Sequence, residues 1–304
     1  MRTADRAIAG LGNPAPYAAH AARAAFPLPH LEAPMAIPRL ALGTLLAAVC
    51  AAPLGAADQD AAAPLEPADP IPTGDALFAR TGLDPTRVTT AIGGRYEVAT
   101  NDYDGSDATR EVLKGSYVWN ELSLAATVPA RVRVNPGAGS TEHGFGDIAA
   151  RGEYAHRLSE QLYGALGLDV IFNSAEEDVL GNNATIIAPF LAVSFERNVK
   201  ERWLLEIHYA TDVAREDGSV PHTRLLEGRL GWLRDLGHGF LGKLEARPSY
   251  DDERQHTGLS AFGAISKLID GHSALSVDIL QPIDRDNRHA FGWQFALEYR
   301  YNFL

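Results

Sequence analysis

The sequence predicts an all-β fold: a transmembrane antiparallel β-barrel of about twelve strands with up-and-down connections. Three observations predict it. From residue 87 onward apolar and polar residues alternate, short and long connections alternate, and aromatic residues gather near the ends of the candidate strands. Alternation matters because successive side chains of a strand point to opposite faces of the sheet.

The segment before the strand pattern contains the signature of an export signal. Met35 opens a run with one early basic residue, an apolar stretch and small residues up to Ala57. That is the order of a secretory signal peptide, so we expect residues 35–57 to send the chain to the periplasm. Residues 1–34 are then an upstream extension from a mis-called start. A retained helix is the alternative, and Val49, directly before the single cysteine, disfavours a lipid anchor.

Residues 58–86 are acidic and rich in proline. Such a composition predicts a periplasmic N-terminal segment without regular structure, and a free tail is the preferred expectation. The short apolar island at residues 76–78 offers an alternative, in which this part of the chain enters the mouth of the barrel.

Residues 87–304 form the predicted outer-membrane barrel. Tilted strands need about 9 to 11 residues to cross a bilayer, and the candidates reach that length. Pro189 falls inside one candidate and predicts a local bulge, because proline removes a donor from the ladder. Alternation is weak in the candidates near 223–235 and 257–268. The candidate strands are 87–101, 109–118, 122–134, 145–157, 162–173, 185–197, 202–213, 223–235, 239–250, 257–268, 272–283 and 290–304.

The connections sort by length along the chain. Short ones such as "WNE" at 119–121 and "DG" at 270–271 alternate with longer acidic ones such as "NSAEEDVLGNN" and "YDDERQH". Strands that cross an outer membrane have short turns on the periplasmic side and long loops outside. A soluble sandwich has no reason to sort its loops in this way.

Each strand has one apolar and one polar face, and we expect the apolar face to meet lipid and the polar face to line the lumen. The polar set contains seven basic and nine acidic residues, so it is nearly neutral. Buried charges usually pair with each other, so most of these residues are expected to be structural. The lumen-facing candidates are Arg95, Glu97, Lys114, Arg151, Glu153, Asp169, Glu206, His208, Asp212, Glu227, Arg229, Lys243, Glu245, Arg247, Asp278, Gln294, Glu298 and Arg300.

Alternation alone also fits a soluble barrel with its faces reversed, and a soluble periplasmic β-protein is the alternative fold. The aromatic residues near strand ends favour the membrane barrel, because they resemble the interface girdles of such proteins. The last strand, "EYRYNFL", resembles the C-terminal assembly signal of bacterial outer-membrane barrels, carried here by Tyr299, Tyr301 and Phe303. The chain departs from that signal by ending in leucine.

The fourth candidate strand opens with "HGFGDIAARGEYAHRL", in which Gly144, Gly146 and Asp147 follow a glycine-rich loop. This element, with the preceding "GSYVWNELSLAATVPARVRV", resembles the outer-membrane β-barrel family named for the meta-pathway of phenol degradation. The resemblance covers about residues 85–304. It implies an outer-membrane barrel with a transporter-like role for aromatic or other hydrophobic compounds. From the residues alone, the glycines predict tight or positive-φ backbone, and Asp147 is placed to accept bonds from nearby amides.

These features together predict an outer-membrane channel or transporter-like protein for small solutes, with lipid and the barrel-assembly machinery as partners. The net charge of −12 argues against a nucleic-acid partner, because phosphate binding needs a basic patch. No motif indicates a cofactor, and no loop has the spacing of a calcium site. A structural or surface barrel without transport is one alternative. A barrel hydrolase is the other; His208 and Asp212 share a face, but about 13 Å of strand rise separates them, so they cannot bond directly.

Overall fold

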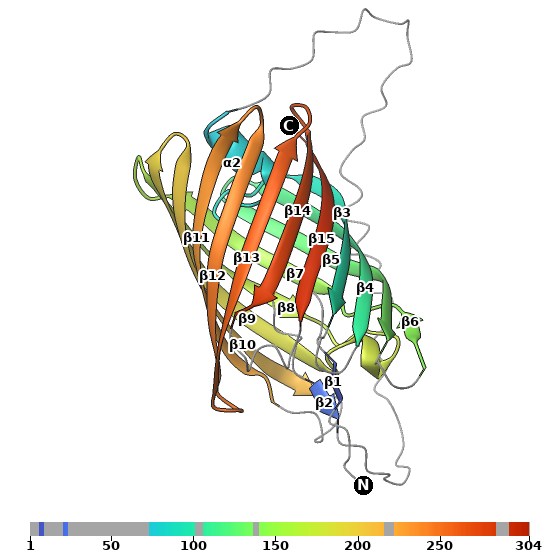
Figure 1. The fold of residues 1–304 in the computed structure, drawn as a ribbon. Helices are drawn as coiled ribbons and strands as arrows, with labels where there is room; N and C mark the ends of the chain where they lie inside the picture. The colour runs from blue at the N-terminus through green and yellow to red at the C-terminus, as the bar shows by residue number, and fades with distance from the viewer. Residues whose placement is uncertain are drawn as a thin grey trace, which may run out of the picture.

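The strand pattern closes into an antiparallel barrel in the computed structural model, which describes residues 6–8, 21–23, 73–100, 106–135, 140–215, 222–283 and 292–303 (Figure 1). Twelve long strands follow one another around the barrel in chain order, and the short β6 (Glu142–Gly144) pairs with the far part of β5. The long strands are β3 (Ala91–Thr100), β4 (Asp107–Trp119), β5 (Leu122–Asn135), β7 (Ala149–Arg157), β8 (Leu162–Ile171), β9 (Ala184–Asn198), β10 (Glu201–Arg215), β11 (Arg224–Gly237), β12 (Phe240–Asp251), β13 (His256–Leu268), β14 (Ser273–Pro282) and β15 (Trp293–Asn302).

The barrel closes where its last strand meets its first. β15 pairs with β3 in one register, from Trp293 opposite Thr100 to Asn302 opposite Ala91. The predicted fold class is therefore confirmed. Closure also leaves the barrel without an open edge strand, which would expose unpaired backbone groups.

Two of the predicted strand boundaries are wrong. The first strand begins at Ala91, four residues later than expected, because residues 73–90 run inside the barrel. The predicted strand 145–157 begins only at Ala149, because residues 145–148, which follow β6 in the chain, are not part of a strand. There the Gly146 N–H donates to the Pro129 carbonyl at 3.1 Å, which carries the chain from β6 back to the wall.

The bulge predicted at Pro189 is also wrong. Pro189 lies opposite Leu168 in an unbroken β8–β9 register. On the β10 side the same register continues past it, from His208–Phe190 to Thr211–Ile187. The irregularities of β10 lie near its two ends instead, at residues 201–202 and 212–214. The strands predicted to alternate weakly, β11 and β13, alternate regularly in burial.

The two faces of the wall have opposite chemistry. In β10, Trp203, Ile207 and Tyr209 are exposed on the outer face, while Glu206 and His208 are buried on the inner face. Large apolar side chains are exposed on the outer face of every long strand. A water-soluble barrel would bury those side chains and expose the charges.

The two ends of the barrel differ in their connections. At the short-turn end lie the turns 120–121, 158–161, 199–200, 238–239 and 269–272, together with the end of β15. The one α-helix among the described residues, α2 (Asp75–Thr81), lies at this same end (Figure 1). The opposite, long-loop end carries the 3₁₀ turn η2 (Asp178–Leu180).

Most of the N-terminal region lies outside the described residues, including the predicted signal 35–57 and residues 58–72. Within residues 1–34 the structure describes β1 (Arg6–Ile8) and β2 (Ala21–Arg23), which pair antiparallel with each other. Among the described helices, none is long and apolar enough to cross a membrane.

A glycine at the barrel seam provides a test of this closure. A Cβ added to Gly93 would lie 2.5 Å from the Tyr299 carbonyl oxygen, a backbone atom of the paired strand. We predict that Gly93→Ala forces β3 away from β15 and destabilises the barrel by about 1–3 kcal/mol. The measurement is the temperature at which the folded, fast-migrating gel band disappears. Gly94→Ala is the control, because its Cβ would meet nothing closer than 4.0 Å; equal melting of both variants would contradict the seam geometry.

Candidate functional site

The inner face of the barrel carries a belt of paired charges, here called the ion-pair belt. Charged groups away from bulk water are stable only when they are paired and hydrogen-bonded. The strands supply these groups from alternate positions, so each one points inward without disturbing the ladder. The belt consists of Arg95, Glu97, Arg110, Lys114, Arg151, Glu153, Asp169, Glu206, His208, Glu227, Arg229, Lys243, Glu245, Arg247, Asp278 and Glu298.

Arg95 ties the belt across the barrel seam. Its two terminal nitrogens contact both oxygens of Asp278 on β14, at 2.6 and 2.9 Å. Its Nε contacts Glu97 at 2.5 Å on its own strand. On the neighbouring strands Lys114 pairs with Glu298 at 2.6 Å. The last two strands are thus joined to the first two by side-chain charge as well as by backbone pairing.

A second part of the belt spans β7 to β11. Arg151 forms a two-point contact with Asp169, at 2.6 and 2.8 Å. His208 Nε2 lies 2.7 Å from Glu206, which in turn lies 3.5 Å from Arg229. Bidentate guanidinium–carboxylate contacts fix geometry as well as charge. His208 Nδ1 also lies 3.9 Å from Asp169, so these contacts connect β7, β8, β10 and β11.

Two aromatic rings on the inner face contact charged residues of the belt. Phe190 on β9 lies under the Arg151 guanidinium at 4.4 Å and stacks on His208 at 5.2 Å. Phe262 on β13 lies under Arg247 at 4.1 Å. A cation over an aromatic face is attracted by the ring quadrupole, so these rings supply partners for the flanking charges.

The short-turn end of the lumen is filled by residues 73–90, here called the plug. Leu77 and Phe78 of α2 are fully buried. They pack against an apolar cluster on the inner faces of β10 to β14. That cluster consists of Leu204, Leu233, Leu241, Leu268 and Ala274.

Arg202 is the main polar anchor of the plug. It is completely buried and contacts Asp84 at 2.9 Å, Glu196 at 3.0 Å and Asp75. Its guanidinium also lies 4.3 Å from the centre of the Phe78 ring. A single side chain from β10 therefore holds both acidic groups of the plug and its aromatic residue.

Backbone contacts complete the attachment. Arg80 donates to the Gly271 carbonyl at 2.5 Å, and Asn302 donates to the Arg80 carbonyl at 3.0 Å. Lys243 donates to the Leu83 carbonyl at 2.8 Å. Gly82 ends the helix with φ near 72°, a conformation that favours glycine. The preferred expectation of a free tail is therefore wrong for residues 73–86, which bury their apolar island inside the barrel.

At the long-loop end Asp147 binds the connection between β8 and β9. One carboxylate oxygen accepts from the Ser174 and Ala175 N–H groups, at 2.9 and 3.0 Å. The other accepts from the backbone N–H and the side-chain amide of Asn182, at 2.6 and 2.9 Å. The expected bonding to nearby amides is confirmed, and it clamps the loop at both of its ends.

The glycines of the same motif meet one of the two expectations, tight or positive-φ backbone. Neither Gly144 nor Gly146 has a positive φ, so that part of the prediction is wrong. Both glycines lie in tight surroundings, as the other part of the expectation has it. A Cβ on Gly144 would lie 2.7 Å from the Glu176 carboxylate, and one on Gly146 would lie 2.8 Å from Val132.

The clamped loop folds inward over the lumen. Leu180 of η2 is buried against Ala99, Ala108, Val132 and Val134, all on the inner faces of β3 to β5. The lumen is thus narrowed at both ends, by the loop against β3–β5 and by the plug against β10–β14.

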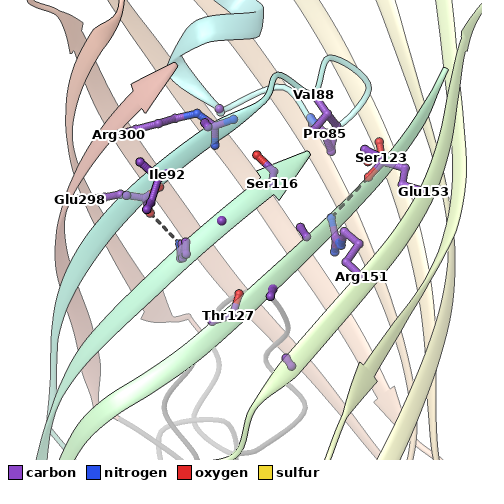
Figure 2. Close-up of a pocket in the computed structure, with 18 of the residues that line it drawn as sticks. Pro85, Val88, Ile92, Ser116, Ser123, Thr127, Arg151, Glu153, Glu298 and Arg300 are labelled. Carbon is purple, nitrogen blue, oxygen red and sulfur yellow. Dashed lines mark hydrogen bonds and ion pairs between the residues drawn. The ribbon is translucent and has the colours of Figure 1, made fainter. Parts of the chain in front are cut away.

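A cavity of about 170 Å³ remains beside the plug, against the wall formed by β3, β4, β5 and β7 (Figure 2). Pro85 and Val88 of the plug form one side of it, and Ser116, Ser123 and Thr127 line the wall opposite. At its rim lie the predicted residues Lys114, Arg151, Glu153, Glu298 and Arg300.

Other predicted residues lie apart from the belt and the cavity. Asp212 is near the long-loop end, where it accepts from the Thr223 N–H at 2.6 Å and lies 3.3 Å from His222. Gln294 is buried on β15. Tyr299, Tyr301 and Phe303 are exposed on the outer face of the wall. No group of three or more His, Cys, Asp or Glu side chains in the described ranges is placed to hold a metal ion.

Several residues of this interior are absent from the sequence prediction. Arg110 and Arg202 lie on the polar faces of their strands, in step with Lys114 and Glu206, so extending the alternation would have identified both. Phe190 and Phe262 are apolar residues on the polar face, so they depart from the alternation that assigns apolar residues to the lipid side. Asp84 lies in a proline-rich stretch without periodicity, so no sequence signal marks it.

Comparison with known proteins finds similar folds among solved structures. No protein-family model matches the chain, and no curated protein matches it in sequence. It is similar in structure to an outer membrane channel from Pseudomonas putida F1, with a TM-score of 0.57 and 14% identity over 71% of this chain and 96% of that one. It is also similar to the NanC porin, with a TM-score of 0.51 and 10% identity over 70% of this chain and 100% of that one. At such identities the likeness shows the fold alone.

The Asp147 clamp makes a measurable prediction about the loop. Hydrogen bonds to a charged acceptor contribute about 1.5–3 kcal/mol each, so Asp147→Ala should free the loop locally. We expect amide exchange at Ser174, Ala175 and Asn182 to rise at least about tenfold, while exchange in β8 and β9 stays slow. Glu177→Gln, an exposed change on the same loop, is the control. Unchanged exchange in Asp147→Ala would show that other contacts hold the loop.

Proposed function

We propose that the chain is an outer-membrane channel for small solutes, exported through the signal at residues 35–57 and inserted as the barrel of residues 87–304. In this orientation the short-turn end faces the periplasm and the long-loop end faces outward. Most of the plug, residues 73–86, belongs to the predicted periplasmic segment 58–86, and the plug then enters the lumen from the periplasmic side.

The observation that carries the membrane location is the inversion of the two faces. Exposed apolar side chains such as Leu113, Leu166, Leu230 and Leu244 surround the barrel, whereas the charged groups are inside. In water this arrangement would leave a wide apolar surface uncovered, and soluble monomers rarely expose such surfaces. In a membrane, lipid tails cover that surface, so the apolar side chains are not exposed to water.

The polar interior supports a channel over a barrel packed solid. The cavity beside the plug is bordered by charged and hydroxyl groups, and such a surface is wetted readily. The two structurally similar proteins are described as an outer membrane channel and a porin. A barrel of about twelve strands also falls between small barrels filled by side chains and large open porins.

The resemblance to the phenol-degradation meta-pathway family supports aromatic or other hydrophobic compounds as one solute class. It rests on Gly144, Gly146 and Asp147, which in this barrel shape a loop attachment. Those residues lie away from the cavity, so the resemblance supports the barrel type more strongly than the solute.

A hydrolase is the less favoured function. His208 is buried in the belt against Glu206 and stacks on Phe190, inside the wall and away from the rim. His156 contacts Glu121 at the outer edge of a turn. Neither arrangement presents a histidine to a serine hydroxyl, which nucleophilic hydrolysis requires.

A structural barrel without transport is the second candidate, and the plug is the observation that favours it. An anchored segment in the periplasmic mouth reduces passage unless it leaves space or moves. Conductance across planar bilayers separates the two functions.

Releasing the plug should widen the channel. Arg202→Gln removes the charge that pairs with Asp84, Glu196 and Asp75, and breaking a buried ion pair costs about 3–5 kcal/mol. We predict single-channel conductance in the wild type and an increase of about twofold or more in Arg202→Gln.

Arg197→Gln is the matched control, because Arg197 is an exposed arginine at the same end, whose ion pair is with Glu201 at 3.5 Å and not with the plug. It should conduct like the wild type. Absence of conductance in folded wild type and in folded Arg202→Gln would refute the channel and leave the structural barrel.

We also propose that Tyr299, Tyr301 and Phe303 form the assembly signal read by the barrel-assembly machinery. Tyr301 and Phe303 pack edge to face on the outer surface at 5.2 Å, where another protein can reach them. The variant with Tyr301→Ala and Phe303→Ala should accumulate unfolded in the periplasm, as measured by the folded fraction in outer membranes. Normal insertion of that variant would rule out this role.

A further inference from the structure

One sector of the inner wall is built from small side chains. Ala91, Ser116 and Ala125 lie in one row across β3, β4 and β5. Gly93 and Thr127 flank Lys114 in the next row, and Ala149 follows on β7. Together with Ser123 these residues form what we call the small-residue wall.

The opposite sector of the same end carries long side chains. There the wall presents Leu204, Leu233, Leu241 and Leu268, and the plug is packed against them. Short side chains extend less far from the wall than leucines do, so they leave space that leucines would fill. The 170 Å³ cavity lies in that space, between the small-residue wall and the plug residues Pro85 and Val88.

The cavity is also lined by a buried carboxylate, one oxygen of which lacks a hydrogen-bond partner in the part of the barrel that the structure describes. Glu153 is 3% exposed, and its Oε1 has no hydrogen-bond partner among the described residues. The other carboxylate oxygen, Oε2, lies 3.9 Å from Arg151, and both residues line the cavity (Figure 2). A buried acceptor left unpaired is costly, so it indicates a position where water or a solute donates.

On the β15 side of the cavity, one of the two basic side chains is paired with a carboxylate and, in the described part of the chain, the other is not. Lys114 is paired with Glu298, while Arg300 donates to the Thr89 hydroxyl at 2.9 Å and has no carboxylate within 4 Å among the described residues. The cavity therefore has a basic and an acidic side chain on its β7 side and again on its β15 side, and the serine and threonine hydroxyls of β4 and β5 lie between them.

We propose that the solute path bypasses the plug along the small-residue wall and admits small polar solutes that hydrogen-bond to Glu153 and the wall hydroxyls. The proposal rests on the channel function and deepens it. It assigns a hydrophilic path where the family resemblance implies a hydrophobic solute. The plug stays seated in this account and forms one side of the path.

Cysteine substitution tests the path directly, because the single native cysteine, Cys50, lies in the predicted signal. Ala125→Cys and Thr127→Cys place a thiol on the small-residue wall. A hydrophilic methanethiosulfonate reagent reacts only with thiols that water reaches. We expect both thiols to be modified in the folded barrel, as measured by mass, and conductance to fall by about half or more.

Ser266→Cys is the control, since Ser266 is also on the inner face but is fully buried and bonded to Ser276 at 2.8 Å. It should stay unmodified in the folded barrel. The path is refuted if the wall thiols stay unmodified, or if they are modified and conductance does not change. A barrel whose wall thiols react but which conducts nothing, even with the plug released, refutes the channel function itself.

Discussion

The structure depends on pairing charges where water is scarce. Arg95, Arg229 and Arg247 are buried inside a wall whose outer face is apolar. A buried charge that loses its partner costs several kcal/mol, so each of these groups needs an opposite charge nearby, which lies on its own strand for Arg247 and on another strand for Arg95 and Arg229. Where the partner lies on another strand, the contact also ties the two strands together. The Arg95–Asp278 contact across β3, β15 and β14 has this effect at the seam.

The same rule explains how the interior is narrowed. The plug carries Asp75 and Asp84 to Arg202, so it is held by the kind of contact that holds the wall. The loop near η2 is held by Asp147, a carboxylate satisfied by four N–H donors. The two segments lie at opposite ends and against opposite sectors of the wall. A path that avoids both of these described segments runs obliquely, from the β10–β14 side at the long-loop end to the β3–β7 side at the short-turn end.

The sequence predicts the barrel wall well because its signal is local. Each strand repeats with period two, so Glu206 and His208 could be assigned to one face from their spacing alone. Arg110 and Arg202 carry the same signal and required only that the period be followed further. The plug could not be predicted in this way. Its helix has seven residues, and its burial depends on Leu204 and Leu241, which are remote in sequence. Pro189 shows the opposite failure, since a local rule predicted a bulge that the paired strands on both sides prevent.

The central claim is that the apolar face of this barrel meets lipid, and membrane fractionation of cells that express the full chain tests it most directly. The account predicts that the protein is found in the outer-membrane fraction, resists extraction by high salt, and is released only by detergent. Recovery of folded protein in the soluble periplasmic fraction would contradict it.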